Sequence, residues 1–146
     1  FARVFAFSKA SIVKQYKKQI VNFFSFLITL YVLIYTVLFN DIFGFVLTIG
    51  VFVLVLISPK RSVFILTRYI IVVGIELVGT YFECWYWPKF PLEVFEFLPS
   101  ANPPSGLGFF YLIIDVCFFY TYITLNKTTW KRFKKIKRVS DYRLIK

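Results

Sequence analysis

The sequence predicts an all-α integral membrane protein with four transmembrane helices. Hydrophobic residues make up 59% of the 146 positions and charged residues 17%, whereas soluble domains average about 45–50% and about 25%. A chain this short buries too little surface to hide that apolar excess in a core, so we expect lipid to cover it. The apolar stretches do not alternate with polar residues as the strands of a membrane barrel do, and this favours helices.

Four apolar stretches approach the length of about 20 residues that spans a bilayer as a helix. They cover residues 20–39, 42–57, 63–82 and 107–125. The second stretch is the shortest, and Phe39 and Ser58 can extend it at the rims. Asn40 and Asp41 form a short turn, in which the carboxylate is available to cap the next helix. Pro59 ends the second stretch because the residue before a proline avoids the α region.

The remaining segments are rich in basic residues or in proline. Residues 1–18 mix apolar and basic side chains and predict an interfacial helix that lies flat before the first crossing. Residues 83–106 hold five of the six prolines and many aromatic residues, and they predict a long outer loop. Residues 126–146 form a basic tail. We expect the whole chain, 1–146, to be a single membrane domain.

The positions of lysine and arginine predict the orientation, because basic residues stay on the cytoplasmic side of a membrane. They concentrate before residue 20, at Lys60 and Arg61, and after residue 125. The turn at Asp41 has none, and the outer loop has only Lys89. With four crossings, all the basic segments lie on one side. Both termini are therefore predicted to be cytoplasmic, in a bacterial inner membrane or an organelle membrane.

Two acidic residues lie at membrane depth, where an ionisable group costs ~2.5–3.5 kcal/mol on insertion scales and marks a candidate functional site. Glu76 in the third span and Asp115 in the fourth each lie about two turns from the outer end of their helix. Thr80 and Glu83 follow Glu76 at i+4 and i+7, on the same helix face. These four residues form a hypothetical site for an ion or a proton, or an interhelical polar contact.

The same residues also have a purely structural interpretation. Glu76 and Asp115 could be protonated, or could bond to Thr80, to Tyr111 or to another subunit, and so hold the bundle together. The chain has no histidine and only two cysteines, which excludes a zinc or iron–sulfur site built from Cys and His of this chain alone. We expect no catalytic residue, no metal and no cofactor. Cys84 and Cys117 are expected to be reduced, because ~15 Å of depth separates them.

Other side chains predict contacts with the membrane surface. Arg68 lies near the cytoplasmic end of the third span and can extend its charge to the headgroups. The tail residues expected to contact anionic headgroups are Lys131, Arg132, Lys134, Lys135, Lys137 and Arg138. Trp85, Trp87 and Trp130 are expected to anchor the chain at the interface. The aromatic loop around Trp85 could instead be a lid over a quinone-like pocket or a docking face for a protein.

These features favour a non-catalytic accessory subunit that assembles or stabilises a larger membrane protein complex. The alternative is a small proton- or cation-coupled transporter that uses Glu76 and Asp115. A third and weaker hypothesis is a membrane enzyme that acts on a lipid or isoprenoid, with Glu76, Glu83 and Asp115 as acid–base groups. The expected partners are membrane lipids, anionic headgroups on the cytoplasmic side and other membrane subunits, with no nucleic acid.

Overall fold

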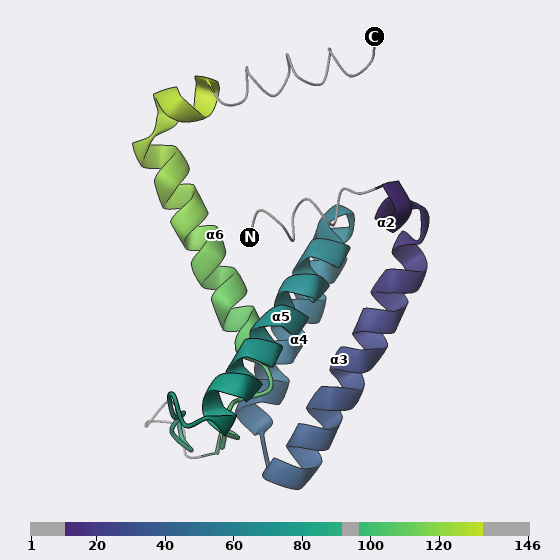
Figure 1. Ribbon diagram of the computed structural model, residues 1–146, viewed down its shortest axis with the longest axis vertical. Coiled ribbons are helices and arrows are strands. Elements are labelled where there is room, and N and C mark those ends of the chain that lie inside the picture. The colour runs from purple at the N-terminus through teal and green to yellow at the C-terminus, as the bar shows by residue number, and fades with distance from the viewer. Residues whose placement is uncertain (1–10, 92–96, 133–146) are drawn as a thin grey trace. The chain divides into compact units, whose positions relative to one another are not determined.

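The computed structural model describes residues 11–91 and 97–132, and every regular element within these ranges is helical (Figure 1). The elements are α2 (Ser11–Gln15), α3 (Lys17–Phe39), α4 (Ile42–Ile57), the 3₁₀ turn η1 (Pro59–Arg61), α5 (Ser62–Tyr81) and α6 (Leu107–Leu125). The chain divides into two compact units, Phe1–Leu112 and Ile113–Lys146. Each unit is described by itself.

Three helical segments within the described ranges are long and apolar enough to cross a membrane. They are Lys17–Phe39, Pro59–Tyr81 and Leu107–Leu125, with mean hydropathies of 2.1, 1.9 and 1.7. The all-helical fold is thus confirmed for the described residues, and these three segments are consistent with a membrane protein. The helix α4 is apolar but has only 16 residues, so its crossing stays a prediction.

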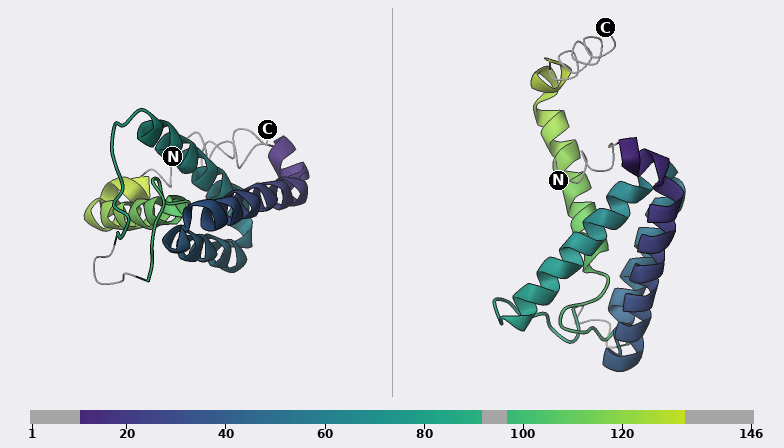
Figure 2. Two further views of the ribbon diagram at one scale, coloured as in Figure 1. Left: turned by 90° about the horizontal axis from the view of Figure 1, so that it is seen from below. Right: turned by 45° about the vertical axis from the view of Figure 1, so that its right-hand side comes forward.

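The first unit is built around α5, which packs against both α3 and α4. Of the residues in its most apolar stretch, 39% are buried, whereas in α3 the share is 11%. The centre of the core contains Ile28, Val32, Val51, Leu66 and Tyr69. In both Figure 1 and Figure 2, α3 and α5 run in the same direction and α4 runs in the opposite direction. Large apolar side chains also cover the outer faces of these helices, as expected for helices surrounded by lipid.

The helix boundaries follow the sequence signals closely. The carboxylate of Asp41 accepts a hydrogen bond from the Gly44 amide and caps α4, as expected. Asn40 before it has a positive φ of 54°, which asparagine tolerates better than most residues. The helix α3 begins at Lys17 rather than at residue 20, and α5 covers Ser62–Tyr81 rather than 63–82.

The structure describes only part of the two terminal segments, the expected interfacial helix and the basic tail. Of the expected interfacial helix 1–18, the structure describes α2, while residues 1–10 lie outside the described ranges. In the second unit, the chain turns at Asn126 and is helical again over residues 127–132. The Trp130 ring packs edge-on against Phe119 with centroids 5.4 Å apart. The tail residues Lys134, Lys135, Lys137 and Arg138 lie outside the described ranges.

A candidate polar site built on two buried carboxylates

The carboxylate of Glu76 is the centre of the first polar cluster. Its side chain is 2% exposed and accepts three hydrogen bonds. The indole nitrogens of Trp85 and Trp87 both donate to Oε2, at 2.8 and 2.9 Å. The Tyr111 hydroxyl donates to Oε1 at 2.9 Å. Carboxylate oxygens accept hydrogen bonds, and all three of these donors are uncharged side chains.

This cluster joins three segments of the first unit. Glu76 lies on α5, the two tryptophans lie in the 83–106 loop, and Tyr111 lies in the first turns of α6. The interaction between Glu76 and Tyr111 is one of the structural alternatives drawn from the sequence. The sequence predicts that the two tryptophans anchor the loop in the membrane interface, and the structure gives their N–H groups a specific acceptor within the protein.

The hypothetical ion site also includes Thr80, Glu83 and Asp115. The Thr80 hydroxyl donates to the Glu76 carbonyl oxygen at 2.7 Å, along its own helix, and so does not use the carboxylate. Glu83 is exposed and has a φ of 56°. Because α5 ends at Tyr81, the helical register that groups Glu83 with Glu76 does not extend to it. Asp115 belongs to the second unit, where its side chain is half-buried in α6.

The carboxylate of Asp41 is the centre of a second cluster, which the sequence indicates only in part. Its side chain is fully buried. Besides capping α4, Oδ1 accepts a hydrogen bond from the Ala101 amide at 3.1 Å, and Oδ2 accepts one from the Ser105 amide at 2.6 Å. These bonds connect the turn before α4 to the far end of the 83–106 loop.

The Tyr69 hydroxyl extends this second cluster into α5. It donates to the Ser105 carbonyl oxygen at 2.6 Å and lies 3.2 Å from the Thr48 hydroxyl. The Tyr69 ring also packs against Gly108, where a Cβ atom would collide with the ring. One buried tyrosine therefore holds the end of the loop and the start of α6 against the bundle.

Hydrogen bonds within the 83–106 loop complete the arrangement. The Trp87 amide donates to the Asn102 side chain at 3.0 Å, and the Ser100 amide donates to the Lys89 carbonyl at 2.9 Å. The loop also bonds to the start of α4, where the Phe43 amide donates to the Pro99 carbonyl at 3.0 Å. Residues 92–96, at the middle of the loop, lie outside the described ranges. Of the described parts of the loop, the first is thus held by Glu76 and the last by Asp41.

The remaining predicted residues differ in their exposure. Arg68 is half-buried on α5, and Lys131 and Arg132 are exposed in the second unit. Both cysteines are free and exposed. Within the part of the chain that the structure describes, His, Cys, Asp and Glu form no group of three that could hold a metal ion.

No protein-family model, curated protein or solved structure matches this chain. The functional argument therefore depends on the two clusters themselves. The sequence points to Glu76 through its depth and to Asp41 as a helix cap. It does not show that both acids bond to one loop, because the partners of Asp41 follow it by 60 and 64 residues.

Proposed function

We propose that the chain is a non-catalytic accessory subunit of a larger membrane protein assembly and that its 83–106 loop faces the partner. The observation that carries this proposal is that Glu76 and Asp41 both direct their carboxylates to hydrogen bonds that hold this loop on the helices. Every oxygen of the two carboxylates accepts at least one of these hydrogen bonds, and a hydrogen-bonded buried network rigidifies the segments that it connects. Segments held in this way, which are the described residues 83–91 and 97–106, can present a surface to a partner at low entropic cost.

The side chains around the fixed tryptophans support this interpretation. Tyr81, Phe82 and Tyr86 are 80%, 68% and 78% exposed, and they lie directly before or within the segment that Glu76 holds. Aromatic residues are enriched where proteins contact one another, and tyrosine is frequent among the residues that contribute most to binding. Aromatic residues also favour the membrane interface, so we place the partner contact at the level of the headgroups.

We further propose four crossings, with α4 as the second. The direction of the helices supports this: α3 and α5 run the same way, and α4, which comes between them in the chain, runs the opposite way (Figure 1). Two helices that cross a membrane in the same direction need a returning crossing between them. The 16 residues of α4 measure about 24 Å, which is short of the ~30 Å hydrocarbon core. Local thinning of the bilayer accommodates such a mismatch at modest cost.

This topology places both termini on the cytoplasmic side, with the loop on the opposite side. The basic residues of the first unit support it. The exposed Lys14, Lys18, Lys60 and Arg61 lie at the ends of α2, α3 and η1, and Lys17 donates from its ammonium group to the Pro59 carbonyl at 2.7 Å. These cations lie at one end of the bundle and would contact anionic headgroups.

The transporter alternative has less support from the surroundings of Glu76. A cation site surrounds its ion with acceptor oxygens, whereas the groups directed at this carboxylate are three hydrogen-bond donors. A metal or sodium ion would have to displace them. We therefore favour the structural role of Glu76 over ion transport.

Extraction of the tagged full chain from its native membrane in a mild detergent tests the proposal. We expect larger membrane proteins to migrate with it in fixed stoichiometry. The double variant Phe82→Ala/Tyr86→Ala should lose these partners. The matched control Tyr16→Ala removes an exposed aromatic side chain at the other end of the bundle and should keep them. A chain that migrates alone, or only with copies of itself, would contradict the proposal.

A further inference from the structure

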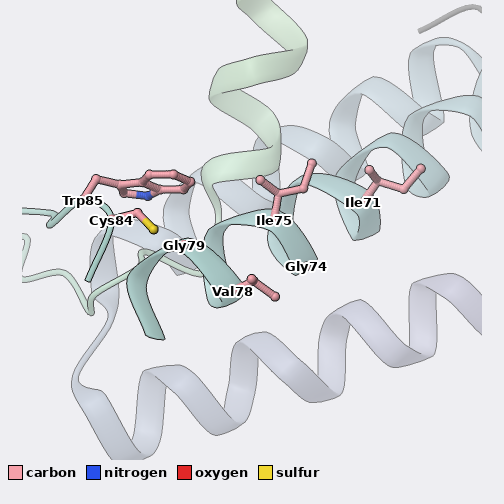
Figure 3. A pocket seen from close by; sticks show the side chains of 7 residues that line it. All are labelled: Ile71, Gly74, Ile75, Val78, Gly79, Cys84 and Trp85. Atoms are coloured by element: carbon pink, nitrogen blue, oxygen red, sulfur yellow. The ribbon is translucent and has the colours of Figure 1, made fainter. Parts of the chain in front are cut away.

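Glu83 has a backbone conformation that suits glycine better than glutamate. Its φ of 56° lies in the left-handed region, which is unfavourable for residues with a Cβ atom. The turn after α5 uses this conformation, because the Cys84 amide then donates to the Gly79 carbonyl oxygen at 2.9 Å. The next residue, Trp85, lies back over the helix at Gly79 (Figure 3). Glycine is the usual residue at this position after a helix.

The charge of Glu83 is also unfavourable where it lies. The helix α5 ends at Tyr81, and the carbonyl end of a helix dipole repels an anion and stabilises a cation. Within residues 11–91 and 97–132, the Glu83 carboxylate has no hydrogen-bond or ion-pair partner. Lys89, the one lysine of the loop, places its ammonium group 5.8 Å from the centroid of the Phe90 ring. Nothing in the described chain therefore offsets this charge.

Exposed aromatic rings flank Glu83 in the sequence. Tyr81 and Phe82 come directly before it, with ring centroids 5.2 Å apart and an interplanar angle of 87°. Tyr86 follows three residues later, and each of the three side chains is at least 68% exposed. An aromatic face attracts a cation, and the planar guanidinium group of arginine stacks on it. A carboxylate beside such rings is therefore suited to bind an arginine side chain.

The 83–106 loop is the acidic part of a strongly basic chain. It contains three glutamates and one lysine, whereas the whole chain has a net charge of +11. Among the described residues of the loop, 83–91 and 97–106, Glu83 is the acidic one. A cationic group of a partner is repelled by the net charge of the chain and attracted to this loop, and such complementarity gives specificity to an interface.

We propose that Glu83 pairs with an arginine side chain of the partner subunit, whose guanidinium group the Phe82 and Tyr86 rings flank. This inference rests on the proposed accessory role and names the chemistry that the partner presents, an arginine at the level of the headgroups on the side of the loop. A guanidinium group at the end of α5 turns the unfavourable charge there into a favourable pair. Arginine fits better than lysine, since interfaces are enriched in arginine and depleted in lysine.

Purification of the tagged full chain with its partners, at about 50 and about 500 mM sodium chloride, tests the pair. We expect salt to weaken the wild-type complex, because salt screens charge pairs near the surface. Glu83→Gln should weaken binding about ten-fold, one decade in the binding constant, and reduce its dependence on salt. Lys89→Gln removes a charge of the opposite sign from the same loop and should not weaken binding.

The outcomes separate this inference from the accessory role. If Glu83→Gln binds the partners like the wild type while Phe82→Ala/Tyr86→Ala loses them, the arginine pair is overturned and the accessory role stands. A wild-type chain that migrates alone refutes the accessory role and this inference with it.

Two further variants distinguish binding from folding. Glu83→Gly relieves the positive φ and removes the charge at the helix end, so we expect a higher melting temperature together with weaker partner binding. Glu83→Arg should abolish binding, and replacement of the partner's arginine, located by crosslinking from position 83, with glutamate should restore it. Unchanged binding of Glu83→Gly would contradict the inference. Crosslinks from position 83 to a lipid, to another copy of the chain or to a partner segment without arginine would contradict it as well.

Discussion

The indole ring of Trp85 lies across Gly79, so close that a Cβ atom at position 79 would collide with three of its ring carbons. This contact lets the indole nitrogen reach the Glu76 carboxylate one turn away, at 2.8 Å. A missing side chain on a membrane helix thus makes a hydrogen bond to a buried acid possible.

Gly79→Ala should therefore destabilise the protein. The added methyl group pushes the indole away from α5, and we expect a loss of about 1–3 kcal/mol, as for overpacking in a core. Gly74→Ala on the same helix is the matched control. Its Cβ atom meets nothing, and alanine favours the helix by about 0.5–1 kcal/mol over glycine. Thermal unfolding in detergent measures both, and equal melting temperatures for the two variants would refute this account of Gly79.

Glu76→Gln should weaken the hold on the loop. The amide keeps one oxygen and replaces the other with a donor group, so either the indoles or the Tyr111 hydroxyl lose their acceptor. We expect a loss of about 1–3 kcal/mol and a shift in tryptophan emission. Glu83→Gln changes an exposed carboxylate and should stay within about 0.5 kcal/mol. If both variants unfold like the wild type, the three bonds to Glu76 do not stabilise the fold.

Asp41→Asn should loosen the far end of the loop. Asparagine still caps helices well, but it has only one acceptor oxygen for three backbone amides. The Ala101 or the Ser105 amide then loses its partner, at a cost of about 1–3 kcal/mol. Hydrogen exchange read by mass spectrometry should show faster exchange in residues 99–106, with α3 unchanged. Faster exchange spread evenly over all the helices would argue against a local role.

Tyr69→Phe should also be destabilising, because the buried Ser105 carbonyl loses its donor. We expect about 1–3 kcal/mol, the usual cost of a buried polar group left unpaired. Tyr81→Phe is the control, since Tyr81 is exposed at the end of α5 and should stay within about 0.5 kcal/mol. Chemical or thermal unfolding of the two variants under the same conditions decides the matter, and the prediction fails if they are equally stable.

The proposed topology can be tested with single cysteines in a Cys84→Ser/Cys117→Ser background. Lys14, Lys60 and Lys89 are exposed and lie in segments separated by the proposed crossings. We expect Lys14→Cys and Lys60→Cys to react with an impermeant maleimide from one face of the membrane, and Lys89→Cys from the other. If Lys14→Cys and Lys60→Cys react from opposite faces, α4 does not cross.

The helices could be predicted from the sequence because their signals are local. The apolar stretches 42–57 and 107–125 coincide with α4 and α6, since Asp41, Pro59 and the prolines of the loop mark their limits nearby. The predicted start of α3 is three residues late because Lys17 and Lys18 are charged, although charged side chains are compatible with the first turn of a helix at the membrane surface.

The polar clusters could be predicted only in part because their bonds connect distant segments. The depth of Glu76 marks it as unusual, but a periodic pattern cannot show that two loop indoles bend back to one of its oxygens. The expected face shared by Glu76 and Glu83 depends on a helix that continues beyond Tyr81. Asp41 is recognisable as a cap because its partner Gly44 is three residues away, while its bonds to the loop depend on tertiary structure.

The separation between Asp41 and its loop partners has a consequence during synthesis. The amides of Ala101 and Ser105 are 60 and 64 residues downstream, and ribosomes add about 5–20 residues per second. For roughly 3–13 s, this acid in the nascent chain has only the start of its own helix as a partner. Quality-control proteases of the membrane would therefore meet unfinished chains in their least stable form, and a chain truncated before residue 100 should be degraded rather than accumulate.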